Sequence, residues 1–116
     1  MPNIVLSIAD DFSRYPAGRT RRDGENSAER FRQDFLIPKL RNAVQSGTRL
    51  AVKLDGVYGY SSSFLEEAFG GLVRSREFEP AVIERSLLIE ADSSIYASAK
   101  IDAEKYLSDE LRRVPA

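Results

Sequence analysis

The chain of 116 residues contains no cysteine, no histidine and no tryptophan. The absence of cysteine excludes disulfide bonds and thiolate chemistry, and the absence of histidine removes the commonest general base and the commonest metal ligand. A Ser-His-Asp triad and a histidine-based zinc site are therefore impossible within this chain. We predict no metal site and no cofactor, and the same absences argue against an enzyme.

The chain also lacks an excess of either charge and a long hydrophobic run. Its 17 basic and 18 acidic side chains leave a net charge of −1, so no general attraction to nucleic acid or membrane is expected. No apolar run approaches the roughly 20 residues that cross a bilayer. The first residues do not resemble a signal peptide, and we therefore expect a cytoplasmic protein.

What is present is enough apolar sequence for one folded domain. The apolar fraction of 42% can form a hydrophobic core, and the length predicts a single domain over residues 1–116. Alternating apolar residues predict strands at residues 3–8, 48–55 and 85–91, with a short additional strand at 15–20. Helical spacing predicts three helices, which begin near Asn26 or Ser27, near residues 61–63, and near Asp92 or Ser93.

This alternation of strands and helices favours an α/β fold with a mostly parallel sheet. The first helix should end at Gly47 and contains Pro38, which predicts a kink or a break near Ile37. Gly70 and Gly71 lie within the second helix, where each costs about 1 kcal/mol relative to alanine. Glycine at these positions suggests that another element approaches closely. The packed face of the last helix is expected to contain Ile95, Ala99 and Ala103.

Three consecutive serines, Ser61, Ser62 and Ser63, stand between the second strand and the following helix. One interpretation is helix capping, since Ser63 with Glu66 three residues later fits a capping box. The other is regulatory phosphorylation at Ser62, because a helix N-terminus favours added negative charge. Both interpretations stay open at this stage.

Carboxylates near the same strand end have a similar ambiguity. Asp55 ends the predicted central strand, where sites gather in open parallel sheets, but Asp55-Gly56 is also ordinary turn chemistry. The adjacent pairs Glu66-Glu67 and Asp10-Asp11 could in principle supply acid–base groups. Neighbours in a helix do not face each other, so the enzyme interpretation is weak.

The loop from Arg14 to Gly24 is locally basic and contains one aromatic residue, Tyr15. Together with the helix start at Ser27, its Arg19, Arg21 and Arg22 form a candidate site for a nucleotide or another anion. The alternative is a solvated loop whose charges are balanced by nearby acidic residues. No glycine-rich phosphate-binding motif is present, and the aromatic content is too low to indicate nucleic-acid binding.

Several of these segments together resemble a known family. The stretch SSSFLEEAFGGL at residues 61–72, the preceding Asp55-Gly56-Val57, and the segments at 12–19, 23–32 and 36–38 look like the STAS-like domain family of unknown function from bacteria and phages. The resemblance covers most of residues 12–73. It implies a STAS-like fold of about four strands in a mixed sheet, with helices packed mainly on one side.

The wider STAS group includes anti-anti-sigma factors, in which a serine at this helix start is phosphorylated by a partner kinase. Placed on this chain, Ser62 falls on that serine, Ser61 replaces an aspartate and Phe64 replaces a glycine. The resemblance implies a non-enzymatic regulatory module with a protein partner, such as a histidine-kinase-like ATPase. The candidate phosphorylation sites are Ser61, Ser62 and Ser63, and the candidate partner-binding residues are Asp55, Phe64 and Glu67. The alternative function is anion binding by the arginine-rich loop.

Overall fold

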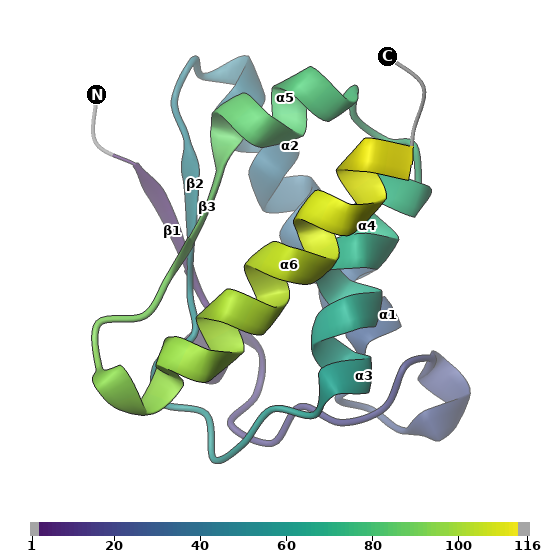
Figure 1. Cartoon of the computed structure of the whole chain (residues 1–116), viewed down its shortest axis with the longest axis vertical. Helices are drawn as coiled ribbons and strands as arrows, with labels where there is room; N and C mark the ends of the chain where they lie inside the picture. The colour runs from purple at the N-terminus through teal and green to yellow at the C-terminus, as the bar shows by residue number, and fades with distance from the viewer. Residues whose placement is uncertain (1–2, 114–116) are drawn as a thin grey trace.

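Three short apolar segments pair side by side as a parallel sheet with helices packed against one face (Figure 1). The computed structural model describes residues 3–113. The strands β1 (Ile4–Ser7), β2 (Leu50–Lys53) and β3 (Leu87–Glu90) lie in the order β1-β2-β3. Because this order follows the chain and parallel crossovers are right-handed, both crossovers place their helices on the same face.

The first crossover is one long helix that starts after a loop. It consists of α1 (Ala28–Phe31), a π-helical segment (Arg32–Leu36) and α2 (Ile37–Gln45). Pro38 therefore does not break the helix. Proline cannot donate a backbone hydrogen bond, so the regular α-helical pattern is interrupted near it. Here the interruption is a wider π-helical turn directly before α2, and the chain stays helical through Pro38. Gly47, with a φ of +69°, ends this region as expected.

The second crossover contains two helical regions. The first consists of α3 (Ser62–Leu65), a π-helical segment (Glu66–Gly70) and α4 (Gly71–Arg74), and the second is α5 (Pro80–Ser86). The chain then forms β3, a 3-10 turn (Ser94–Tyr96) and the long helix α6 (Ala97–Arg113). Short helical turns also occur at Ile8–Phe12 and Arg21–Asp23.

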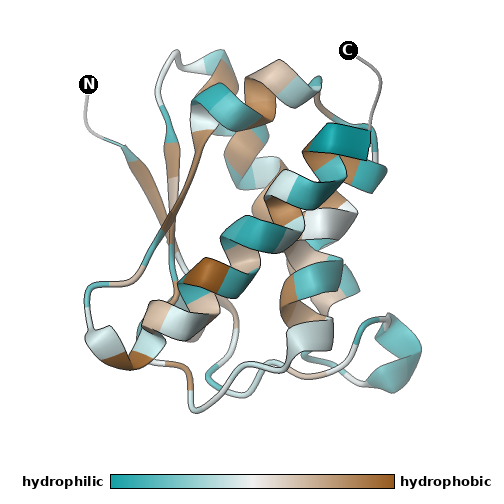
Figure 2. Ribbon diagram, in the orientation of Figure 1, coloured by the Kyte–Doolittle hydropathy of each residue, from teal (hydrophilic) through white to brown (hydrophobic). Residues whose placement is uncertain are grey.

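The hydrophobic core lies between the sheet and these helices. Strand register places Leu6, Val52 and Ile89 in one row on the inner face, and all three are buried. The helices contribute the large, fully buried side chains Phe31, Phe64, Phe69, Leu36, Leu40 and Leu72. Figure 2 shows the strands as mostly hydrophobic, whereas the visible outer surface of α6 is mostly hydrophilic. The opposite face of the sheet is more open, and Val5 on it is 51% exposed.

Two predictions about the sheet are wrong. The described residues form three strands, all parallel, instead of about four in a mixed sheet. The segment 15–20 is not a strand, because its backbone caps α1 instead: Gly18 and Arg19 accept hydrogen bonds from the N–H groups of Ala28 and Glu29. Pro16 cannot donate to a strand ladder, and Gly18 has a φ of +89°, which interrupts extended structure.

Two further differences concern helices. α5 was not predicted, although Pro80 at its first position and the buried Ile83 are ordinary helix signals. Ile95, expected on the packed face of the last helix, is 81% exposed because it lies in the 3-10 turn that precedes α6. Among residues 3–113, no helix is both long and apolar enough to cross a membrane.

Candidate functional site

The carboxyl ends of the three strands meet at the lower edge of the sheet in Figure 1, and Asp55 ties two of their loops together. Its carboxylate oxygens accept hydrogen bonds of 2.9 Å from the backbone N–H groups of Asp92 and Ser93. Burial acts to raise the pKa of Asp55, but these two hydrogen bonds hold it below its usual value. The geometry therefore gives Asp55 a clear role in holding the β3 loop against the β2 loop.

Lys53 reinforces the same connection from the end of β2. Its ammonium group lies 3.0 Å from Glu90 and 3.3 Å from Asp92. The hydrogen bond with Glu90, followed by that with Asp92, raises the pKa of Lys53. The charges at this edge are thus paired with one another across the strands.

The three serines have three different environments. Ser61 is the N-cap of α3, since its hydroxyl accepts a hydrogen bond of 3.1 Å from the N–H of Phe64. Ser63 lies 3.2 Å from the Ser61 hydroxyl and is not the cap, so the expected Ser63–Glu66 capping box does not form. Ser62 is exposed, and within residues 3–113 its hydroxyl has no hydrogen-bond partner. Of the three serines, Ser62 is therefore the one whose hydroxyl forms no hydrogen bond that supports the fold.

Ser62 borders a hollow of about 350 Å³ between the loop after β2 and the start of α6. Tyr58 and Ile95, which are 75% and 81% exposed, line this hollow with the half-buried Tyr60 and Tyr96. Two partly buried hydrogen bonds fix its base: the Tyr96 hydroxyl donates to the carbonyl of Val57 at 2.6 Å, and the Tyr60 hydroxyl donates to the carbonyl of Leu54 at 2.7 Å. The hollow thus combines exposed apolar side chains with hydroxyl groups, and those of Ser62, Ser98 and Tyr58 have no hydrogen-bond partner among residues 3–113.

A second exposed aromatic residue extends this surface. Tyr15 stacks on Tyr58 with 4.9 Å between ring centroids and an angle of 8° between the rings. Arg14 joins the two loops that hold the rings, because its guanidinium donates to the carbonyl of Gly56 and its carbonyl accepts from the N–H of Tyr58. Sequence reasoning missed this pair, since the two tyrosines are far apart in the chain and no local pattern links them.

The other two candidate partner-binding residues are Phe64 and Glu67. Phe64 faces the interior, and Glu67 is ion-paired within the protein. Phe64 is completely buried and packs among the rings of Phe12, Phe31 and Tyr60. Glu67 forms an ion pair of 2.9 Å with Arg32, whose side chain is only 12% exposed. Phe64 therefore presents no surface to a partner, and the carboxylate of Glu67, whose side chain is 22% exposed, is already held by arginine.

A network of charged side chains surrounds Gly70 and Gly71. The predicted close approach of other elements to these glycines is confirmed, because Glu110 of α6 lies next to Gly70 and Arg32 lies next to Gly71. Glu66 pairs at 2.7 Å with both Arg19 and Arg74, and Arg74 also pairs with the buried Glu110 of α6. The hydrogen bonds from Arg74 lower the pKa of Glu66, with a further contribution from Arg19. A Cβ atom on Gly71 would lie 2.5 Å from the Arg32 guanidinium, so a larger residue would force the end of that side chain to move.

The residues of the candidate anion site do not converge. Arg19 turns to Glu66, whereas Arg21 pairs with Asp34 at 3.0 Å and donates to Gln33. Ser27 is fully buried and caps α1 by accepting a hydrogen bond from the N–H of Arg30. Arg22 is exposed in the turn Arg21–Asp23. The structure thus separates these arginines instead of gathering them around one ligand.

No group of three or more acidic side chains within residues 3–113 is arranged to hold a metal ion. Glu66 and Glu67, the first carboxylates in the helix that follows the serines, are both paired with arginine. What the carboxyl edge offers is therefore a set of ordered loops that present Tyr15, Tyr58, Ile95 and Ser62 at the surface.

Comparison with known proteins agrees with the fold and with the resemblance in the sequence. No curated protein and no solved structure matches the chain significantly. The family model described as "STAS-like domain of unknown function (DUF4325)" matches residues 27–96. This match begins at the cap of α1 and continues through β3 to the 3-10 turn, so it reaches further toward the C-terminus than the motifs seen in the sequence. Since it covers more than half of the chain, the protein belongs to the family of STAS-like domains of unknown function.

Proposed function

We propose that this STAS-like domain is a non-enzymatic module that binds another protein through the carboxyl edge of its sheet and is switched by phosphorylation of Ser62. The observation that carries the proposal is the free, exposed hydroxyl of Ser62 at the rim of an apolar hollow. The surface that we assign to the partner consists of Tyr15, Tyr58, Ile95 and Ser62, and it is called the docking surface below.

Exposure and rigidity together support this assignment. Tyr15, Tyr58 and Ile95 are each more than 60% exposed, which is unusual for large apolar side chains that lie close together. The loops beneath them are held by Asp55, Arg14 and the Tyr96 hydroxyl, so the surface loses little conformational entropy when a partner binds. Tyrosine is also among the residues that contribute most to protein interfaces.

Phosphorylation would change this surface in a defined direction. A phosphate on Ser62 adds about −1.5 to −2 charge next to the apolar hollow, which also contains Asp102. The start of the helix tolerates this charge, whereas a partner that packs apolar groups into the hollow does not. We therefore propose that the unphosphorylated form binds and the phosphorylated form is released. Relationship to the STAS group suggests a histidine-kinase-like ATPase partner in the bacterial cytoplasm.

The test compares two exposed isoleucines of the same region. Partners are captured from native cells with the tagged wild-type chain and with four variants, Ile95→Asp, Ile101→Asp, Ser62→Asp and Ser62→Ala. Mass spectrometry then quantifies each partner and any phosphate on Ser62. Ile101 is 64% exposed on α6 and does not line the hollow, so it is the matched control. Ile95→Asp and Ser62→Asp are expected to reduce the amount of captured partner at least tenfold relative to wild type. Ile101→Asp and Ser62→Ala are expected to capture as much partner as wild type.

A structural control separates binding from stability. Ser61→Ala removes the cap of α3 and is expected to lower the free energy of unfolding by about 1 kcal/mol, without reducing capture of the partner. Ser62→Ala is expected to leave stability unchanged. Equal capture by wild type, Ile95→Asp and Ser62→Asp would refute the docking surface.

A further inference from the structure

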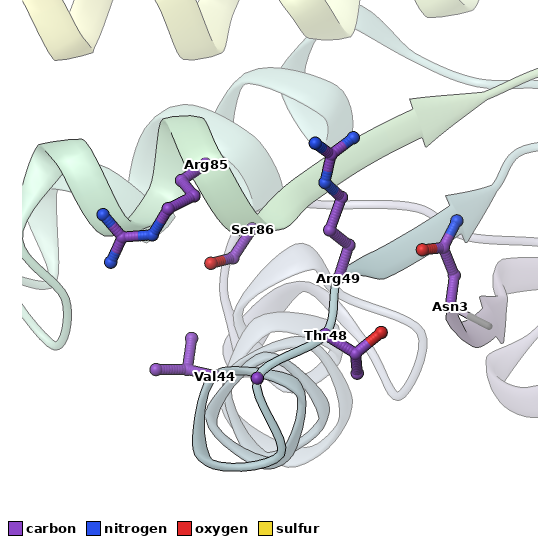
Figure 3. Close-up of a pocket in the computed structure, with 7 residues that line it drawn as sticks. Asn3, Val44, Thr48, Arg49, Arg85 and Ser86 are labelled. Atoms are coloured by element: carbon purple, nitrogen blue, oxygen red, sulfur yellow. The ribbon is translucent and has the colours of Figure 1, made fainter. Parts of the chain in front are cut away.

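A second hollow, of about 480 Å³, lies at the opposite end of the sheet, where the strands begin (Figure 3). Three segments contribute to it: the residue before β1, the turn between α2 and β2, and the end of α5. Its lining residues are Asn3, Val44, Gly47, Thr48, Arg49, Arg85 and Ser86. A volume of this size is within the range of small-molecule sites.

The two arginines of this hollow have no acidic partner. Arg49 and Arg85 are both exposed, and neither guanidinium forms an ion pair or a hydrogen bond within residues 3–113. No Asp or Glu of that part of the chain lines the hollow. This differs from Arg19, Arg21 and Arg74, each of which has a carboxylate within 3.0 Å. The hollow is therefore positively charged, and no acidic side chain of residues 3–113 neutralises it.

Ser86 adds a hydroxyl group to the wall of the hollow. The residue is only 5% exposed, and no hydrogen-bond partner for its hydroxyl occurs among the described residues. This hydroxyl is not sealed from solvent, because the buried side-chain polar atom without a partner in that part of the chain is Nε of Arg32. In Figure 3 the Ser86 hydroxyl lies between the side chains of Arg49 and Arg85, at the wall of the hollow. A ligand in the hollow would therefore meet a hydroxyl that is free to donate a hydrogen bond.

We infer that this hollow binds a small molecule through a phosphate group, with Arg49, Arg85 and Ser86 as its ligands. Arginine pairs with phosphate oxygens through charge-assisted and often bidentate hydrogen bonds, and the serine hydroxyl donates a further one. Because both arginines are unpaired and exposed, they can turn toward the phosphate without breaking an existing ion pair. The Asn3 side chain supplies an amide at the rim of the same hollow, and the remaining volume is available to the rest of the ligand.

This site is separate from the docking surface and does not depend on the proposed function. None of its lining residues borders the hollow next to Ser62. It also differs from the arginine-rich loop between Arg14 and Gly24, in which Arg19 and Arg21 are already paired with carboxylates. A phosphate-bearing ligand here would stabilise the starts of β2 and β3 and the turn between α2 and β2.

The experiment is a titration of the full chain in low-salt buffer without phosphate, followed by calorimetry and by the backbone amide signals in NMR spectra. The probes are inorganic phosphate, adenosine monophosphate and uncharged adenosine, which separate recognition of phosphate alone from recognition of a larger ligand. We expect saturable binding of at least one phosphate probe, no binding of adenosine, and the largest shifts at the amides of Thr48, Arg49 and Ser86.

Variants identify the groups that bind. Arg49→Gln and Arg85→Gln are each expected to weaken the phosphate probe about tenfold, and Ser86→Ala severalfold, because each removes a hydrogen bond to a charged group. Arg22→Gln changes the net charge equally at a distant exposed position and is expected to leave the affinity within twofold.

The proposal is overturned by no saturable binding at millimolar probe, by shifts confined to other regions, or by an equal loss in Arg22→Gln. Shift mapping on the wild-type chain gives a result even where a variant does not fold. Binding of adenosine monophosphate without binding of inorganic phosphate would support the site and assign it to a ligand larger than the free ion.

Discussion

The two ends of the parallel sheet use charge in opposite ways. At the carboxyl end, the ionic side chains of Asp55, Lys53 and Arg14 are satisfied by other loops of the protein. At the amino end, Arg49 and Arg85 have no such partner within residues 3–113. The overall charge of −1 conceals this difference, because a near-neutral chain can still contain a local excess of positive charge.

The comparison teaches what each end is available for. Paired charges hold loops in place, so the carboxyl end can present exposed tyrosine and isoleucine side chains on a rigid base. Unpaired arginines contribute little to holding the fold, so the amino end can accept a negatively charged ligand at small structural cost. The same side-chain type therefore has a structural role at one end of the sheet and a binding role at the other.

The largest expected effect tests this contrast directly with Arg32 and Arg49. Arg32 is 12% exposed and donates at 2.9 Å to both the carbonyl and the carboxylate of Glu67. Arg32→Gln should lower the free energy of unfolding by about 2–4 kcal/mol, because the partly buried Glu67 loses its shortest ion pair and keeps only the longer ones to Arg19 at 3.6 Å and Arg74 at 3.8 Å. Arg49→Gln should change it by less than about 0.5 kcal/mol. Urea unfolding at neutral pH in buffer without phosphate measures both, and similar losses would contradict the contrast.

A smaller effect concerns the glycines around which the charge network is built. In Gly71→Ala the new Cβ would lie 2.5 Å from the Arg32 guanidinium and 2.9 Å from the Glu67 carboxylate. We expect a net loss of about 1–3 kcal/mol from this overpacking, even though alanine has the better helix propensity. Gly59→Ala is the matched control, since a Cβ there meets nothing within 4 Å. A stability gain in Gly71→Ala, measured by thermal unfolding, would show that the network adapts without cost.

The smallest of these effects depends on pH and involves Asp55. Its pKa is lowered below the ordinary value of 3.8 in the folded state, so its contribution to stability is present above pH 3.8 and is lost as the pH falls through the folded-state pKa. Asp55→Asn should therefore cost about 1–2 kcal/mol at neutral pH, with the difference from wild type vanishing in acid.

Urea unfolding across an acidic pH series measures this difference. Asp102→Asn is the control, because the Asp102 side chain is exposed and has no ion pair among the described residues. A loss in Asp55→Asn that is the same at every pH would show that the carboxylate charge is not what holds the β3 loop.

Local patterns were enough to predict much of the fold. Apolar alternation located the three strands, and the serines near residues 27 and 61 marked helix starts, because capping depends on neighbours within three residues. The details differ, since Ser61 and not Ser63 is the cap of α3, and Ser93 caps the 3-10 turn that precedes α6. The prediction failed for α5, whose seven residues give too short a periodic pattern to detect. It also failed at 15–20, where the backbone finds its hydrogen-bond partners in the first turn of α1 and not in the sheet.

For the candidate sites too, features set by near neighbours in the chain could be predicted, whereas contacts between distant segments could not. The position of Ser62 at a helix start could be predicted, but not that its hydroxyl alone among the three serines is free. Phe64 was predicted to contact a partner beside the serines, whereas in the structure it fills the core. The pairing of Arg19 with Glu66, which are 47 residues apart in the chain, removed the expected anion site.

By itself, the sequence determined the α/β class, the absence of thiol and imidazole chemistry, and the relationship to STAS-like domains, because these depend on composition and on patterns between near neighbours. Only the tertiary structure decided which charges are paired and which are left free. Ion pairs and hollows form between segments that are distant in the chain, such as the α2–β2 turn and the end of α5 around Arg49 and Ser86. Their partners are set by the crossovers of the parallel sheet, and no local pattern carries that information.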